Sequence, residues 1–275
     1  MALERLEPRG VAELLGDAIS AYRRQFKPLL ALSVTVGVPM TLITSFMLWA
    51  SNKVAPAPMD PETADLAELG RFMWEVAVST AVSSVVVLIA VVLWSVATAA
   101  WVRGASRGLA GEGIDVMEAC SFAVARFRPL LGAVLLSSSL LSLLAVTIIG
   151  IPLAVYFFVT WAFIIETVVL EGQRTRQALS RSSALVKGNW WRVVGFALLA
   201  FIVVGVPSLL LYYLGSVVSG GNVILSNLLS SLLMLLLAPI GAVASVLMYF
   251  DLRVRKEEYT LAKLKAEVGG APTAP

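Results

Sequence analysis

The sequence predicts an all-α integral membrane protein with six transmembrane helices, three cytoplasmic amphipathic helices at the membrane interface and a threefold internal repeat. Three observations lead to this prediction: the composition, four long charge-free runs, and an amphipathic stretch that recurs before pairs of apolar segments. Of the 275 residues, 59% are hydrophobic and only 14% are charged. Soluble domains carry about 25% charged residues. The chain is therefore too apolar for an ordinary soluble protein.

The charge-free runs set the number of spans. They cover residues 28–52, 76–102, 129–165 and 193–250. About 20 helical residues cross the roughly 30 Å apolar core of a bilayer. The first two runs therefore each make one span, whereas the longer third and fourth runs must each fold into two. The six spans are expected at about 28–50, 73–102, 129–149, 152–170, 191–214 and 223–250.

The basic residues orient these spans. If the chain crosses the membrane at each predicted span, only Lys53 and Arg71 of its 21 basic residues lie on the side opposite the termini. Cytoplasmic loops carry the excess of Lys and Arg in membrane proteins. We therefore expect a multi-pass protein of the cell (inner) membrane with both termini in the cytoplasm.

The repeat is indicated by the amphipathic stretches 11–27, 114–128 and 174–192, each of which precedes a pair of spans. Each stretch places apolar residues on one helical face and charged residues on the other. The junction FKPLL at 26–30 recurs almost unchanged as FRPLL at 127–131. The predicted organisation is a single membrane domain at 1–256, with repeat units at about 11–102, 114–170 and 174–250, and a charged cytoplasmic tail at 257–275.

Basic residues in these stretches form the main candidate site. Amphipathic helices of this kind lie at the membrane interface with Lys and Arg near anionic headgroups. They could recruit lipid headgroups or a protein partner, or they could merely anchor the bundle; a second copy of the chain is a further partner to consider. The candidate contacts are Arg23, Arg24, Lys27, Arg126, Arg128, Arg174, Arg176, Arg181 and Arg192.

Catalytic chemistry is not expected. The chain has no histidine, which excludes a Ser-His pair and His-ligated metals, and its one cysteine, Cys120, excludes a cysteine metal cage. No phosphate-binding glycine motif is present. We therefore expect no enzyme, no cofactor and no nucleic-acid partner.

Glu166 is the one acidic residue expected inside a span. Ionisable residues within the membrane are costly and often functional. Glu166 lies about one turn from Glu171 and the interface, so two interpretations remain open. It reaches water or pairs with Arg174 in a structural role, or it serves transport or ligand binding.

Helix-breaking residues interrupt three predicted spans. They lie at 37–39, 205–207 and 238–241. Corresponding breaks near mid-membrane mark the binding sites of some transporters, but Gly and Pro also kink membrane helices simply to improve packing. Packing kinks are the favoured interpretation.

Several segments resemble the membrane region of the glycerophosphoryl diester phosphodiesterase membrane-domain family. They are GVAELL at 10–15, YRRQFKPLL at 22–30, VLEG at 169–172, ALSRS at 178–182, LVKGNWWR at 185–192 and YFDLRVRKE at 249–257. In the relatives that give the family its name, a catalytic barrel uses histidine and acidic residues to bind a metal. This chain has neither histidine nor such a barrel, so the resemblance implies a prokaryotic multi-pass membrane protein without that activity.

These observations favour a non-catalytic multi-pass membrane protein that acts as a scaffold, an accessory subunit or a lipid-interacting subunit. The expected partners are membrane lipids, through anionic headgroups at the cytoplasmic face. The alternative is a transporter or channel component that uses the Gly/Pro-broken helices and Glu166. An enzyme acting on lipid phosphates ranks last.

Overall fold

The structure is a computed structural model that describes residues 8–56 and 65–269, and every regular element in these two ranges is a helix. The helices are α1 (Val11–Arg24), α2 (Phe26–Asn52), α3 (Leu66–Ala110), α4 (Val116–Ala125), α5 (Phe127–Ala145), α6 (Gly150–Thr160), α7 (Ile164–Glu171), α8 (Thr175–Val186), α9 (Trp190–Ala200), the π-helical segment η1 (Phe201–Gly205), α10 (Val206–Val218), α11 (Val223–Glu257) and α12 (Leu261–Gly269).

Six helical stretches within these described residues are long and apolar enough to cross a membrane, which agrees with the predicted number of spans. They are Phe26–Asn52, Leu66–Ala110, Phe127–Ala145, Gly150–Glu171, Trp190–Val218 and Met234–Glu257. The fourth stretch is broken between α6 and α7, and the fifth contains η1. The second is much longer than its predicted span, because α3 continues for 45 residues.

The helix ends follow from local side-chain chemistry. Asp65, Asp115 and Asn222 precede α3, α4 and α11, and their side chains accept hydrogen bonds from backbone N–H groups of the first helical turn. Such caps satisfy donors that have no partner within the helix. Gly111 and Gly172 end α3 and α7 with φ of 84° and 69°, a left-handed conformation that favours glycine.

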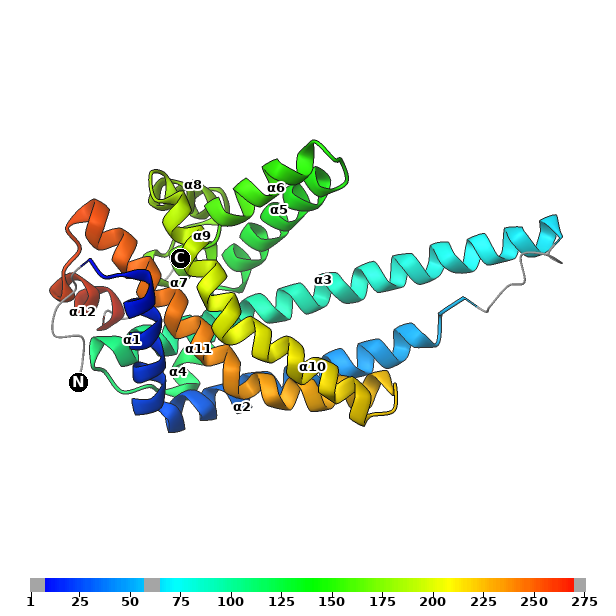
Figure 1. The fold of residues 1–275 in the computed structure, drawn as a ribbon, viewed down its shortest axis with the longest axis horizontal. Coiled ribbons are helices and arrows are strands. Elements are labelled where there is room, and N and C mark those ends of the chain that lie inside the picture. The colour runs from blue at the N-terminus through cyan, green and yellow to red at the C-terminus, as the bar shows by residue number, and fades with distance from the viewer. Residues whose placement is uncertain (1–7, 57–64, 270–275) are drawn as a thin grey trace.

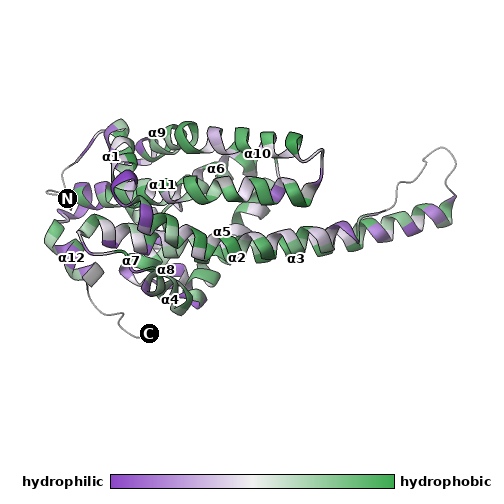
Figure 2. Cartoon of the chain, turned by 90° about the horizontal axis from the view of Figure 1, so that it is seen from below, coloured by the Kyte–Doolittle hydropathy of each residue, from purple (hydrophilic) through white to green (hydrophobic). Residues whose placement is uncertain are grey.

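Three helical hairpins spread from one end of the molecule (Figure 1). They are formed by α2 with α3, by α5 with α6, and by α9, η1 and α10 with α11. The helices α1, α4, α8 and α12 gather at the end from which the hairpins spread, which we call the charged end. Hydrophilic residues are concentrated there and at the far tip of α3, while the hairpins are mostly hydrophobic (Figure 2).

The helices α1, α4 and α8, which correspond to the predicted amphipathic stretches, each make most of their contacts with one hairpin and the helix beside it. Helix α4 contacts α3 and α2, helix α8 contacts α5 and α7, and α1 contacts α11 and α9. The apolar face of α1, which includes Leu14, Leu15 and Ala18, is buried against these helices. The protein itself therefore covers this face, which was expected to turn toward lipid.

The C-terminal helix differs from the expected free tail. Helix α11 ends at Glu257, and Glu258 turns the chain with φ of 49°. Helix α12 then folds back and packs on α3 and α7, burying Tyr259 and Leu264. Residues 258–269 of the predicted charged tail therefore pack on the bundle, because two apolar side chains of this segment find a buried site there. Residues 270–275 of the predicted tail lie outside the described residues.

The expected helix breakers have different outcomes. Helices α2 and α11 continue through Pro39 and Pro239. The breaker segment at 205–207 begins at Gly205, the last residue of the π-helical segment η1. In the described residues of these three spans, the helix is therefore widened locally at η1 rather than interrupted.

Candidate functional site

Three of the nine basic candidates bind other groups of the protein. Arg126 donates to the carbonyl oxygen of Val168 at 2.7 Å, and its guanidinium lies 4.6 Å from the ring centre of Phe122. Arg192 pairs with the buried Asp251 at 2.8 Å. These side chains hold helices together, and their charge is already used within the chain.

Arg181 is the third of these internal residues. It donates to Glu171 of α7 at 2.6 Å and also pairs with Glu257 at the end of α11. The hydrogen bonds to Glu171 and then to Glu257 raise the pKa of Arg181 above its ordinary value. A guanidinium shared by two carboxylates is a structural link between α7, α8 and α11.

The other six basic candidates are exposed, and the ion pairs found among the described residues include none of them. They are Arg23, Arg24, Lys27, Arg128, Arg174 and Arg176. The first three lie at the junction of α1 with α2, and the others lie where α5 meets α8. Their charge is turned outward rather than used in the protein.

The exposed arginines of α5 and α8 come together because these helices approach closely. A Cβ atom on Gly132 of α5 would overlap the side chain of Thr175, the first residue of α8. Arg174 and Arg176 flank Thr175, and Arg128 lies one turn before Gly132. We call Arg128, Arg174 and Arg176 the basic surface. Arg126 adjoins it, and burial, followed by the positive charge of Arg103, lowers the pKa of Arg126.

Glu166 lies in the interior, at 3% exposure, between α7 and α11. Its carboxylate accepts a hydrogen bond from the hydroxyl of Ser245 in α11. Of the alternatives considered for Glu166, the pairing with Arg174 is not found among the described residues, where Arg174 is exposed at the start of α8. The described residues supply Glu166 with a hydroxyl partner and no ion pair.

Two buried arginines were not singled out from the sequence. Arg103, at the end of α3, pairs with Glu118 of α4 at 2.8 Å. Arg253, near the end of α11, pairs with Glu267 of α12 at 2.8 Å and lies over the Tyr259 ring. Both follow long apolar runs closely, and in the sequence they contributed only to the charge bias that orients the spans. Nearby acidic residues, such as Glu118 only 15 positions after Arg103, are the signal that could have indicated ion pairs.

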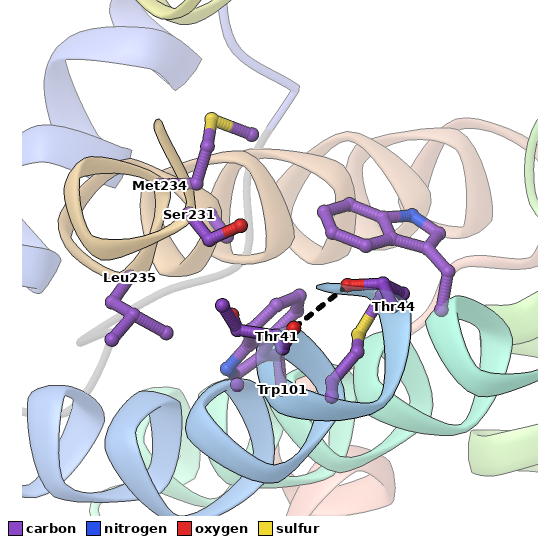
Figure 3. Close-up of a pocket in the computed structure, with 10 residues that line it drawn as sticks. Thr41, Thr44, Trp101, Ser231, Met234 and Leu235 are labelled. Atoms are coloured by element: carbon purple, nitrogen blue, oxygen red, sulfur yellow. Dashed lines mark hydrogen bonds between the residues drawn. The ribbon is translucent and has the colours of Figure 1, made fainter. Parts of the chain in front are cut away.

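Two of the helix-breaker segments meet at a cavity between α2, α3 and α11. Its volume is about 100 Å³, and Gly37 and Ala238 line it together with Thr41 and Trp101 (Figure 3). The approach of α2 to α11 is close, since a Cβ on Gly37 would overlap Leu235. Glu166 does not line this cavity, so the two features expected of a transport site lie apart.

The described residues offer little for metal or acid–base chemistry. No group of three or more His, Cys, Asp or Glu side chains that could hold a metal ion occurs among them. The buried arginines described above are paired with carboxylates, whereas Glu166 bonds a hydroxyl. The six exposed basic candidates are available to bind anionic groups.

Comparison with known proteins gives one match. No curated protein and no solved structure matches the chain, and nothing links it to the glycerophosphoryl diester phosphodiesterase membrane-domain family, so that resemblance stays a prediction. The model of a family described as "Domain of unknown function (DUF7847)" matches residues 110–252. The match runs from the end of α3 to the end of α11 and covers just over half of the sequence. The chain therefore belongs to the DUF7847 family.

Proposed function

We propose that this chain is a non-catalytic six-span protein of the cell membrane that binds anionic lipid headgroups at a cytoplasmic face and acts as a scaffold or accessory subunit. The observation that carries the proposal is the separation of the basic residues into two sets. Some are held in internal ion pairs, while the basic surface remains exposed. A surface that only stabilised the fold would have its charges paired within the protein.

The orientation rests on the charged end. The amphipathic helices gather at one end of all three hairpins (Figure 1), where hydrophilic residues are concentrated (Figure 2), and Lys and Arg favour the cytoplasmic side. The apolar hairpins then cross the bilayer, and both termini are cytoplasmic. The exposed apolar side chains of the hairpins, such as Leu143, Phe158 and Leu209, would face lipid tails.

The packing of the amphipathic helices supports a threefold repeat. Helix α4 covers the first hairpin and α8 covers the second, so each packs on the hairpin that precedes it in the chain. The helix that follows the third hairpin, α12, packs on α3 and α7 instead, and α1, from the start of the chain, contacts α11 and α9 of the third hairpin. Three equivalent units, in which the helix of one unit covers the hairpin of another, account for this pattern. We include in the same proposal a relationship to the glycerophosphoryl diester phosphodiesterase membrane domain.

Two ion pairs and one backbone hydrogen bond link a hairpin end to an amphipathic helix, or to the segment just before it, in these units. Arg103 at the end of the first hairpin binds Glu118 of α4, and Glu171 at the end of the second binds Arg181 of α8. At the end of the third hairpin, Asp251 accepts a hydrogen bond from the backbone N–H of Arg9, two residues before α1 begins. The polarity differs, but the linkage of a hairpin end to an amphipathic helix is the same.

The lipid-binding proposal is tested by neutralising the basic surface. Each basic residue near an anionic membrane contributes about 1 kcal/mol. The triple variant Arg128→Gln, Arg174→Gln, Arg176→Gln is therefore expected to bind phosphatidylglycerol at least tenfold more weakly in a native mass spectrometry titration from detergent micelles. The matched control is Lys187→Gln, Lys263→Gln, Lys265→Gln, which removes three exposed charges from the same end. Equal losses in both variants would contradict a specific surface.

The topology is tested by labelling cysteines in a Cys120→Ala background. Asn52→Cys is expected to react with a membrane-impermeant maleimide in intact cells, because it lies at the far end of α2. Ala184→Cys, exposed on α8, is expected to react only after the membrane is permeabilised. The reverse pattern would invert the orientation and remove the cytoplasmic basic surface.

A transporter is the alternative, and the burial of Glu166 against Ser245 favours it. A carboxyl group at such a depth can carry an exchangeable proton. In proteoliposomes that contain a pH-sensitive dye, a proton flux that is lost in Glu166→Gln and kept in Ser183→Ala would support transport. No flux in the native protein would leave Glu166 as a structural residue.

A further inference from the structure

The cavity between α2, α3 and α11 starts where α3 enters the charged end, since Trp101 of its lining lies two residues before Arg103. On α2, Gly37 is ten residues from Lys27, which corresponds to about 15 Å along a helix. On α11, the lining residues Ser231, Met234 and Leu235 lie on the side of Pro239 away from the charged end. The cavity therefore extends from the edge of the charged end into the apolar spans.

The lining of the cavity is neutral and mostly apolar. Apart from the hydroxyls of Thr41, Thr44 and Ser231, the described lining consists of aromatic, aliphatic, methionine and glycine residues. The hydroxyl of Thr44 donates to the carbonyl oxygen of Thr41 (Figure 3). Apolar walls with a few polar groups are typical of small-molecule sites, and methionine side chains adapt readily to different ligands.

One polar group of the lining lacks a partner. Trp101 is 3% exposed, and its indole Nε1–H finds no hydrogen-bond acceptor among the described residues. Indole nitrogen can only donate, and a buried donor without an acceptor is unfavourable. Trp101 and Thr41 face the same space in Figure 3. A ligand that presents an acceptor oxygen here would satisfy the donor.

We propose that this cavity binds the uncharged polar end of a membrane-dissolved lipid, through a carbonyl or hydroxyl oxygen that accepts a hydrogen bond from Trp101. The absence of any charged side chain from the described lining disfavours a phosphate headgroup. A volume of about 100 Å³ admits the oxygen-bearing end of such a molecule, with its chain outside among the exposed apolar side chains. This site is separate in position and chemistry from the basic surface.

Two probes distinguish a carbonyl from a hydroxyl source. Decylubiquinone carries carbonyl acceptors and farnesol carries a hydroxyl, and each is titrated against the full chain in detergent micelles by native mass spectrometry. Binding of either supports the proposal, and the tighter one identifies the kind of oxygen. If neither binds, or if only phosphatidylglycerol is retained, the proposal is overturned.

Variants assign the binding to the cavity. Trp101→Phe keeps an aromatic ring without the donor and is expected to weaken binding about tenfold. Ala238→Leu fills the cavity and is expected to abolish binding. Trp191→Phe, on an exposed tryptophan outside the lining, is the matched control and should bind as the native chain does. If Trp101→Phe does not fold, Thr41→Val and Ala238→Leu carry the test, and unchanged binding in both overturns the proposal.

Binding of a neutral lipid at the cavity can be tested separately from binding of phosphatidylglycerol at the basic surface. The triple variant of the basic surface should bind decylubiquinone or farnesol as tightly as the native chain does. A loss of neutral-ligand binding in that variant would place the ligand at the charged end and overturn the cavity site. A loss of phosphatidylglycerol binding alone would leave the cavity proposal intact.

Discussion

The charged end and the outer parts of the hairpins differ in what covers their apolar side chains. In α11, 67% of the most apolar stretch within Met234–Glu257 is buried inside the protein, whereas none of the corresponding stretch of α3 is buried. Both helices are long and apolar, and both belong to hairpins. Apolar surface as extensive as that of α3 is not left open to water in soluble proteins. At the charged end the protein covers its own apolar faces, whereas along the hairpins the described residues leave them exposed, as the proposed membrane location requires.

The two regions also treat charge differently. At the charged end, arginines such as Arg103 and Arg253 are buried with carboxylate partners. In α7, by contrast, the buried carboxylate of Glu166 has no basic partner among the described residues. It accepts a hydrogen bond from the hydroxyl of Ser245 instead. Removing one member of a buried ion pair should therefore destabilise the charged end strongly. The stability of the hairpins should depend instead on the lipid or detergent that contacts their exposed side chains.

The largest expected effect comes from Arg253, which is 6% exposed. Arg253→Gln removes the cation that pairs with Glu267 and lies beside Glu171. Breaking a buried ion pair by removing one partner costs about 3 kcal/mol or more. The free energy of unfolding, measured by denaturant titration in detergent micelles, should fall by that amount.

Arg255 provides the matched control for Arg253. It lies two residues further along α11, its side chain is partly exposed, and its partner Asp251 keeps a second cation, Arg192. Arg255→Gln should lower the free energy of unfolding by less than about 1 kcal/mol. Similar losses for the two arginines would mean that burial does not govern the charged end.

The next effect concerns the break between α6 and α7. The hydroxyl of Ser182 in α8 donates to the carbonyl oxygen of Thr160 and accepts from the backbone N–H of Phe163. Ser182→Ala leaves both buried backbone groups without this partner, which costs about 2 kcal/mol. Ser183→Ala, which loses only a bond within α8 to Leu179, should cost less than half as much in the same unfolding measurement.

A smaller effect is expected from Tyr259, which anchors α12. Its hydroxyl donates to Glu267 at 2.5 Å, and burial, followed by this hydrogen bond, raises its pKa above the ordinary value of 10. The folded state thus favours the neutral phenol. Its contribution is present below pH 10 and is lost as the pH rises above 10.

Tyr259→Phe isolates this contribution. The variant should be about 1.5 kcal/mol less stable at pH 8, the amount typical of a hydrogen bond to a charged group. The difference between the native and variant proteins should shrink as the pH rises above 10. A difference that stays constant from pH 8 to pH 11 would show that the phenol proton does not stabilise α12.

Much of the fold could be predicted from the sequence because the apolar runs and the charge bias are strong local signals. The number of membrane-length helices and the amphipathic stretches follow from them. The path of α12 could not be predicted, since Tyr259 and Leu264 reveal a buried face only when a site on α3 and α7 exists. The break at residues 161–163 could not be predicted either, because its bonds come from Ser182, about 20 residues further along the chain.

The candidate site was predicted only as a set of basic residues. Their division into internal and exposed members depends on long-range partners: Arg192 finds Asp251, 59 positions away, while Arg176 is left exposed. The cavity was anticipated only as two breaker segments, and its neutral lining depends on the register of three helices. Composition and periodicity do not reveal which side chains far apart in the sequence contact each other in the fold.

The smallest effect is expected at Val87 of α3, and Val102 of the same helix is the residue to compare with it. Val87 and Val102 both lie in α3, but Val87 is 60% exposed along its apolar length and Val102 is 0% exposed at the charged end. Val102→Ala deletes buried methyl groups and should cost about 2 kcal/mol. Val87→Ala should change the free energy of unfolding by less than about 0.5 kcal/mol, because the detergent that replaces lipid contacts alanine as readily as valine. If Val87→Ala proves as costly as Val102→Ala, the outer half of α3 is covered by protein, and a second chain rather than the bilayer is its partner.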